Sequence, residues 1–129
     1  MTRSFDAAVL EAARTEREIG LTTFGRVTNE PARITIWITP IKDRLYVRSG
    51  GGMGRDWTKN LAAHGRGILH MGGADVPFTA RHVTDLAEAK SVTRACREKY
   101  GSNVAVGNDE ATPTPAETAT FEVLPVEGS

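Results

Sequence analysis

The sequence predicts a mainly β (α+β) fold, in which six antiparallel strands curl into a small barrel with helices at its periphery. Six segments alternate apolar and polar residues with the period of a half-buried strand. Short turn-forming sequences join most of them into hairpins, and three further segments have helical spacing. Because hairpins dominate, we expect a barrel rather than a layered α/β fold.

The first half of the chain predicts one helix followed by three strands. Ser4 is a suitable N-cap for a helix over Phe5–Arg17, whose thin apolar stripe suggests that it packs at an edge or against a partner. The first two strands are separated by the turn sequence Thr28-Asn29-Glu30-Pro31, and the next two by Lys42-Asp43. These strands are expected at Ile19–Val27, Arg33–Thr39 and Arg44–Ser49.

The second half predicts two helices and three strands. A short helix is expected over Asp56–Ala63. Asp85, with Glu88 three residues later, indicates the start of a longer helix that ends near Gly101. The polar segment Ser102–Ala116 predicts a loop. The remaining strands are expected at Gly67–Met71, Val76–Val83 and Thr118–Leu124.

Length and composition indicate one domain over residues 1–129. The 16 basic and 16 acidic residues balance, which argues against a nucleic-acid partner. No apolar run approaches the ~18–20 residues of a membrane span, and the first residues lack the apolar segment of a signal peptide. The single cysteine, Cys96, leaves no internal disulfide. We therefore expect a cytoplasmic protein.

The most informative segment is Leu45–Leu61, in which a strand leads through a glycine-rich loop into a helix. Glycines let the backbone approach an anion closely, and the helix that follows offers free N–H groups. Arg48 and Arg55 flank this loop. The segment predicts a phosphate site, although a flexible surface connection would look similar locally.

A second candidate wall of the site is the strand Arg33–Thr39. Its apolar residues, Ile34, Ile36 and Ile38, are expected in the core. The opposite face combines a cation, two hydroxyls and an indole, an unusual mixture for a surface that contacts only solvent. These residues are Arg33, Thr35, Trp37 and Thr39.

Several short motifs follow one another in a specific order: Thr22-Thr23-Phe24-Gly25-Arg26-Val27-Thr28, Pro31-Ala32-Arg33, Ile36-Trp37, Val47-Arg48-Ser49-Gly50-Gly51, Trp57-Thr58-Lys59-Asn60-Leu61 and Phe78-Thr79-Ala80-Arg81. This order and spacing resemble the deazaflavin-dependent nitroreductase-like group of split β-barrel proteins. That group lies in the superfamily of FMN-binding pyridoxamine phosphate oxidases. The resemblance covers Leu21–Val83, about half of the chain.

The resemblance implies a six-stranded split barrel with a cofactor held in its groove. The cofactor phosphate would lie at Ser49 and the glycines after it, with arginines as counter-charges. Trp57 and Asn60 would line the ring system, although Trp57 could equally anchor its helix in the core and Asn60 could cap backbone groups. The implied cofactor-binding residues are Arg33, Thr35, Trp37, Arg48, Ser49, Gly50, Gly51, Gly52, Arg55, Trp57 and Asn60.

The resemblance also implies a function. The cofactor would be a deazaflavin coenzyme of the 8-hydroxy-5-deazaflavin type, with FMN as the alternative. The protein would be an oxidoreductase that transfers hydride between this cofactor and a small electron-poor substrate, or else a non-catalytic cofactor-binding or carrier protein. Tyr46 is a candidate proton donor, and no metal site is predicted. A homodimer is expected, because one small barrel can only half enclose the groove.

Overall fold

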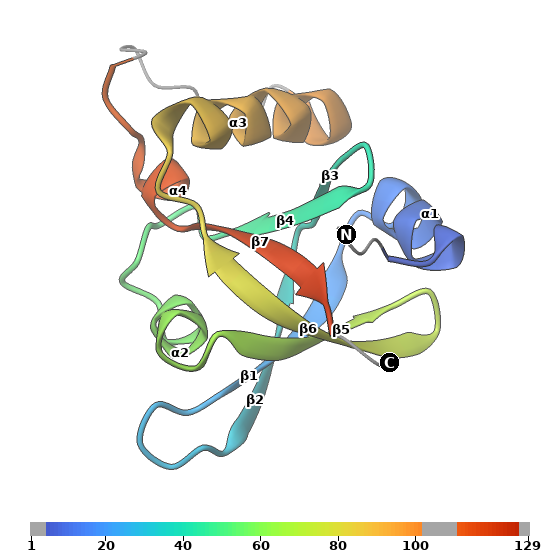
Figure 1. Cartoon of the computed structure of the whole chain (residues 1–129), viewed down its shortest axis with the longest axis vertical. Helices are drawn as coiled ribbons and strands as arrows, with labels where there is room; N and C mark the ends of the chain where they lie inside the picture. Colours follow the sequence, from blue (N-terminus) through green and yellow to red (C-terminus); the bar gives the residue numbers. More distant parts are fainter. Residues whose placement is uncertain (1–4, 102–110, 127–129) are drawn as a thin grey trace.

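Seven strands form a single antiparallel sheet with helices around it (Figure 1). The computed structural model describes residues 5–101 and 111–126. The elements are α1 (Ala7–Thr15), β1 (Ile19–Phe24), β2 (Pro31–Ile36), β3 (Thr39–Ile41), β4 (Arg44–Arg48), α2 (Asp56–His64), β5 (Arg66–Met71), β6 (Ala74–His82), α3 (Leu86–Tyr100), α4 (Pro115–Thr118) and β7 (Thr120–Pro125). None of the helices in the described ranges has the length and apolar character needed to cross a membrane.

The two edge strands of the sheet are almost adjacent in the chain. The strand order is β2-β1-β5-β6-β7-β4-β3, which puts β2 and β3 at opposite ends. Only Trp37 and Ile38 separate them in sequence. Such a connection reaches at most about 11 Å, so the sheet has to curl until its edges approach each other. The half-barrel in Figure 1 is the result.

The predicted count of six strands is wrong, because the expected strand Arg33–Thr39 is two strands. β2 ends at Ile36 and β3 begins at Thr39, whose side chain is buried rather than on the exposed face. The chain turns from one edge of the sheet to the other between them. Apolar–polar alternation continues through this corner, so the sequence pattern does not reveal it.

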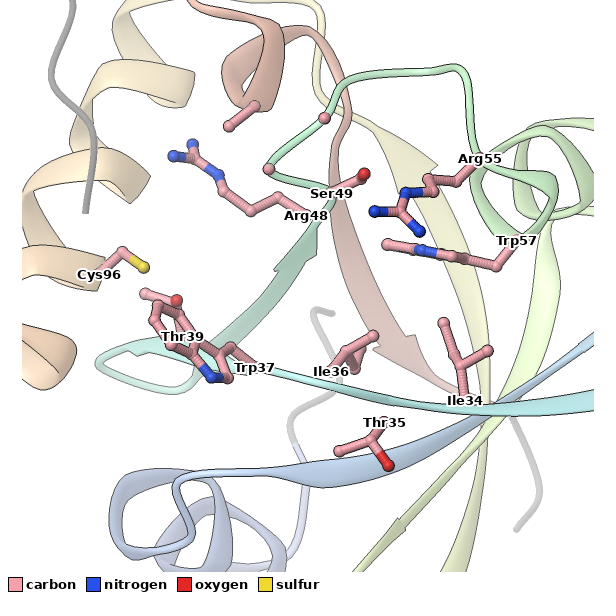
Figure 2. A pocket seen from close by; sticks show the side chains of 13 residues that line it. Ile34, Thr35, Ile36, Trp37, Thr39, Arg48, Ser49, Arg55, Trp57 and Cys96 are labelled. Atoms are coloured by element: carbon pink, nitrogen blue, oxygen red, sulfur yellow. The ribbon is translucent and has the colours of Figure 1, made fainter. Parts of the chain in front are cut away.

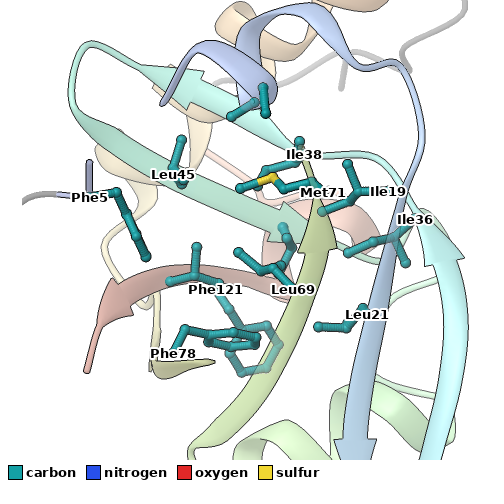
Figure 3. Close-up of a cluster of buried hydrophobic side chains, with 14 of the residues drawn as sticks. Phe5, Ile19, Leu21, Ile36, Ile38, Leu45, Leu69, Met71, Phe78 and Phe121 are labelled. Atoms are coloured by element: carbon teal, nitrogen blue, oxygen red, sulfur yellow. The ribbon is translucent and has the colours of Figure 1, made fainter. Parts of the chain in front are cut away.

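The main core lies inside the curled sheet (Figure 3). Leu21, Leu69 and Phe78 point inward from β1, β5 and β6, and none is more than 1% exposed. α1 packs against this core through its buried Ala12 and Ala13. The thin apolar stripe of α1 is therefore covered within the chain and leaves no argument for a partner at that helix.

The helix boundaries differ in detail from those predicted. α1 spans Ala7–Thr15 instead of Phe5–Arg17, and Ser4 lies outside the described residues. The start of α3 is confirmed, because the Asp85 side chain accepts a hydrogen bond from the Glu88 amide.

The segment Ser102–Ala116, predicted as a loop, contains the start of a short helix. Residues 102–110 lie outside the described part of the chain, but α4 begins at Pro115. Thr114 and Glu117 form a reciprocal capping box at its N-terminus. The Thr-Pro-Ala-Glu sequence is a signal for such a start.

Glu117 joins α4 to α3 through a buried ion pair. Its carboxylate is 2.8 Å from the Lys90 ammonium, and it accepts hydrogen bonds from the Thr93 hydroxyl (2.7 Å) and the Thr114 amide (2.8 Å). Burial alone would raise the pKa of Glu117, but these three interactions lower it to about 2.

We predict that this carboxylate makes stability depend on pH in acid. Because the folded pKa lies below the ordinary value near 4.5, the stabilisation is complete above pH 4.5 and is lost as the pH falls toward 2. The contribution is about 3 kcal/mol. Urea unfolding at several pH values checks this. Glu117→Gln should be less stable at pH 7 and should show a shallower pH dependence; equal slopes for the two proteins would contradict the assignment.

Candidate functional site

A cavity of about 650 Å³ lies between β2 and the loop that joins β4 to α2 (Figure 2). This volume is within the range of small-molecule binding sites. The cavity faces the edge strand β2 of the curled sheet. It is lined by Ile34, Thr35, Ile36, Trp37, Thr39, Arg48, Ser49, Gly50, Gly51, Arg55, Trp57, Cys96 and Ala116.

The cavity brings together most of the residues predicted to bind a cofactor, namely Thr35, Trp37, Arg48, Ser49, Gly50, Gly51, Arg55 and Trp57. Three predicted residues lie outside its lining: Arg33, Gly52 and Asn60. Five further residues line it: Ile34, Ile36, Thr39, Cys96 and Ala116. Thr39 belongs to the polar face expected on this strand, and the sequence does not predict the other four as site residues. Alternation had assigned the isoleucines only to the core, although β2 is an edge strand and meets the cavity with both faces.

The polar end of the cavity is the turn that follows β4. The Gly52 amide donates to the Ser49 carbonyl at 3.1 Å and closes this turn. Ser49 is only 6% exposed. Among the described residues, no fully buried polar side-chain atom lacks a partner, and no hydrogen bond involves the Ser49 hydroxyl. This hydroxyl therefore opens into the cavity, on the side where Arg55 lies (Figure 2).

The two glycines inside this turn leave room for a ligand. Within the described ranges, the amides of Gly50 and Gly51 make no backbone hydrogen bond. A Cβ atom built on Gly50 would meet no atom within 4 Å. Two N–H groups without a backbone partner and a hydroxyl thus belong to the cavity lining, where an anion can bind.

Arg55 adds an unpaired positive charge beside these donors. It is the N-cap residue of α2, and its exposed guanidinium makes no hydrogen bond or ion pair with the described residues. No side chain caps the start of α2, so the N–H groups of its first turn are also available. Arg55 and the glycine turn together form a site suited to phosphate.

Arg48 has a different role from Arg55. Its guanidinium turns toward α3 and β7, where it donates to the hydroxyls of Thr120 (3.0 Å) and Thr93 (2.8 Å) and to the Ala89 carbonyl (3.0 Å). Burial lowers the pKa of Arg48. This side chain fastens β4 to α3 and β7, and it contributes a fixed positive charge to the cavity wall.

The rest of the cavity lining is mostly aromatic and aliphatic. Ile34 and Ile36 extend from β2, and Trp57 both lines the cavity and packs against the main core. Both readings of Trp57 from the sequence are thus compatible with its position. Trp37 lies at the corner after β2, with its ring stacked on Tyr100 at 4.1 Å between centroids. Planar apolar surfaces of this kind suit a ring system.

Asn60 holds the two walls of the cavity together from outside it. Its side-chain oxygen accepts hydrogen bonds from the Arg26 amide (3.2 Å) and guanidinium (2.9 Å). One turn along α2, a His64 ring nitrogen lies 2.8 Å from the Gly25 carbonyl. The β1–β2 connection is therefore fixed to α2, as in the alternative role expected for Asn60.

The remaining predicted residues lie away from the cavity. A Cβ atom built on Gly20 would be 2.9 Å from the Arg33 guanidinium, so Arg33 crosses β1. Gly52 has a φ of 85° and packs beside Pro115. Tyr46 is 2% exposed, donates to Glu88 and does not line the cavity. The suggestion that Tyr46 donates a proton to a ligand is therefore wrong.

Comparison with known proteins gives one family and several structural relatives. The family described as "Uncharacterized protein conserved in bacteria (DUF2255)" matches residues 9–123. No curated protein matches the sequence significantly.

Three solved structures illustrate the structural likeness. The heme storage protein HutZ from Vibrio cholerae is 13% identical, with a TM-score of 0.69 over 98% of this chain and 93% of that one. An F420-H2 dependent reductase (FDR-A) is 17% identical, with a TM-score of 0.60 over 84% and 94% of the two chains. A FAD-binding protein from Mesorhizobium loti is 16% identical, with a TM-score of 0.58 over 97% and 93%. The resemblance to split-barrel flavin and deazaflavin proteins is thus confirmed for the fold.

We predict effects of different size on stability for the two arginines of the cavity. Arg48→Ala should lower the free energy of unfolding by about 2–4 kcal/mol, because it removes three hydrogen bonds from a half-buried site. Arg55→Ala should change it by less than about 0.5 kcal/mol, because its side chain is exposed and unpaired. Urea denaturation measures both. Equal losses in the two variants would contradict the different roles assigned to them.

Proposed function

The chain belongs to the DUF2255 family, and we propose that this member binds a flavin-type cofactor in the groove between β2 and the β4–α2 turn. The cofactor phosphate is held by Ser49, Gly50, Gly51 and Arg55, and the ring system lies toward Trp37 and Trp57. The chain forms one split-barrel cofactor-binding domain over residues 1–129.

One observation carries this proposal. The unpartnered hydroxyl of Ser49, the free amides of Gly50 and Gly51 and the unpaired guanidinium of Arg55 line a cavity that is also lined by Trp37 and Trp57. A phosphate attached to a planar apolar ring system matches both kinds of lining. The cofactors named for the F420-dependent and FAD-binding structural relatives have this composition.

Two exposed cations favour a deazaflavin coenzyme over FMN. Both cofactors carry a tricyclic ring and a ribityl phosphate, but the deazaflavin adds an acidic tail beyond the phosphate. Arg55 is the N-cap of α2 and Lys59 lies in its first turns, so both charges are at the start of this helix. An acidic tail that leaves the groove past the start of this helix meets both charges.

The proposed activity is hydride transfer between the bound cofactor and a small electron-poor substrate. A bound flavin or deazaflavin supplies this chemistry itself, and the protein supplies binding and orientation. A non-catalytic carrier remains the second candidate, because the described lining of the cavity contains no histidine or carboxylate. Reoxidation of the reduced, protein-bound cofactor by a nitroaromatic compound supports the enzyme; tight binding without reoxidation supports the carrier.

We predict that Arg55→Ala weakens binding of both FMN and the deazaflavin about tenfold. A charge-assisted hydrogen bond to phosphate contributes about 1.5–3 kcal/mol, and 1.4 kcal/mol corresponds to a factor of ten. Calorimetric or fluorescence titration of the ligand-free protein measures the dissociation constants. Arg14→Ala is the matched control, because Arg14 is an exposed arginine of α1 outside the cavity lining.

Lys59→Ala separates the two cofactors in the same titration. It should weaken binding of the deazaflavin, whose acidic tail reaches Lys59, and leave FMN binding unchanged. Unchanged affinity of Arg55→Ala for both ligands would show that the cofactor phosphate does not bind at this turn. Tighter binding of FMN than of the deazaflavin by the parent protein would reverse the preferred cofactor.

A homodimer completes the proposed site. The groove is lined in part by β2, whose outer edge has no strand partner among the described residues. A second copy placed there would enclose the bound ring, and binding sites occur preferentially at such interfaces. We predict a dimer of about 28 kDa, twice the 13.9 kDa of the chain, in light scattering at micromolar concentration. A monomer under these conditions, with or without cofactor, would contradict the proposal.

A further inference from the structure

Trp37 is an aromatic residue of the cavity that lies outside the hydrogen-bonded strands of the sheet. It lies in the two-residue corner between β2 and β3, outside both strands. It is 39% exposed, more than any other large hydrophobic residue of the described chain except Val27. The backbone ladder therefore does not fix the indole, and its orientation depends on other contacts.

Those contacts come from the last two residues of α3. The Tyr100 ring stacks on the indole with an interplanar angle of 6°. Its hydroxyl accepts a hydrogen bond from the Ile38 amide (3.1 Å) and lies 2.8 Å from the Arg17 carbonyl, to which it donates. The Lys99 ammonium donates to the carbonyls of Ile38 (2.8 Å) and Ala13 (2.6 Å).

The two side chains together satisfy both backbone polar groups of Ile38: its amide donates to the Tyr100 hydroxyl, and its carbonyl accepts from the Lys99 ammonium. The corner of the sheet, the end of α1 and the end of α3 meet at these two side chains. Burial raises the pKa of Tyr100 to about 12, so its hydroxyl keeps its proton at neutral pH and can donate. Burial lowers the pKa of Lys99 to about 8, which shows that the position disfavours the charge. The two carbonyl contacts offset part of this cost.

We propose that Tyr100 and Lys99 are positioning residues that set the orientation of Trp37 before any ligand binds, and so determine the affinity of the groove for a planar ring. This inference rests on the proposed function for its ligand. Neither Tyr100 nor Lys99 lines the cavity, so both act through Trp37 and its neighbour Ile38. Stacking on Tyr100 covers one face of the indole and leaves the other for the ligand ring.

The first arm of the test uses the protein without cofactor. Trp57→Phe leaves Trp37 as the only tryptophan, so its acrylamide quenching reports the indole alone. In this background Tyr100→Leu removes the stack and should increase the quenching constant about twofold. Tyr46→Phe is the matched control, because Tyr46 is the other buried tyrosine and does not contact Trp37. Lys99→Met removes the contact with the Ile38 carbonyl, should also increase the quenching constant, and provides the test if Tyr100→Leu does not fold.

The second arm measures ligand binding with Trp57 intact. Tyr100→Leu should weaken binding of FMN and of the deazaflavin about tenfold, while Tyr100→Phe, which keeps the stack, should weaken it less. The quenching arm needs no cofactor, so it separates a failure of this inference from a failure of the proposed function. Folded Tyr100→Leu and Lys99→Met variants whose quenching constants equal that of the parent would overturn the inference.

Discussion

The short corner Trp37–Ile38 is the constraint on which the rest of the structure depends. It joins strands at opposite ends of the sheet order, so the seven-stranded sheet cannot lie flat. Curling brings the edge strand β2 opposite the turn after β4, and the cavity lies between them. The same constraint that closes the core of this small chain therefore also creates its groove. A longer connection would allow the edges to separate.

Polar contacts then fix the walls of this groove. Asn60 and His64 tie α2 to the β1–β2 connection, Arg48 ties β4 to α3, and Tyr100 holds the corner itself. The donors and acceptors of these side chains are used in hydrogen bonds within the protein. The Arg55 guanidinium, the Ser49 hydroxyl and the glycine amides of the turn make no such bonds within the described chain. The first group of residues therefore builds the site, and the second group can bind a ligand in it.

Local sequence features predicted the parts of this arrangement that depend on local interactions. The hairpins, the glycine turn before α2 and the Asp85 cap of α3 follow from turn chemistry, capping and alternation. The corner that divides β2 from β3 did not follow, because alternation runs unbroken from Ile34 to Ile38. The polar segment Ser102–Ala116 does not predict α4 by periodicity, although Thr114 and Glu117 have the spacing of a capping box.

The roles of individual site residues depended on contacts distant in sequence. No local pattern shows that Arg48 turns toward Thr93 and Thr120 while Arg55 stays free, since both flank the same glycines. Cys96 of α3 is buried and also forms part of the cavity wall, which its position in the sequence does not reveal. The sequence thus predicts most residues of the groove, but only tertiary packing shows which of its cations is available to bind a ligand.

The most direct test of this account is an NMR titration of the isotope-labelled, ligand-free protein with the deazaflavin coenzyme or FMN. The account predicts that the largest chemical-shift changes fall on the amides of Gly50 and Gly51 and on the two indole N–H signals of Trp37 and Trp57. Saturable shifts confined to residues outside the cavity, or no shifts at millimolar cofactor, would contradict it.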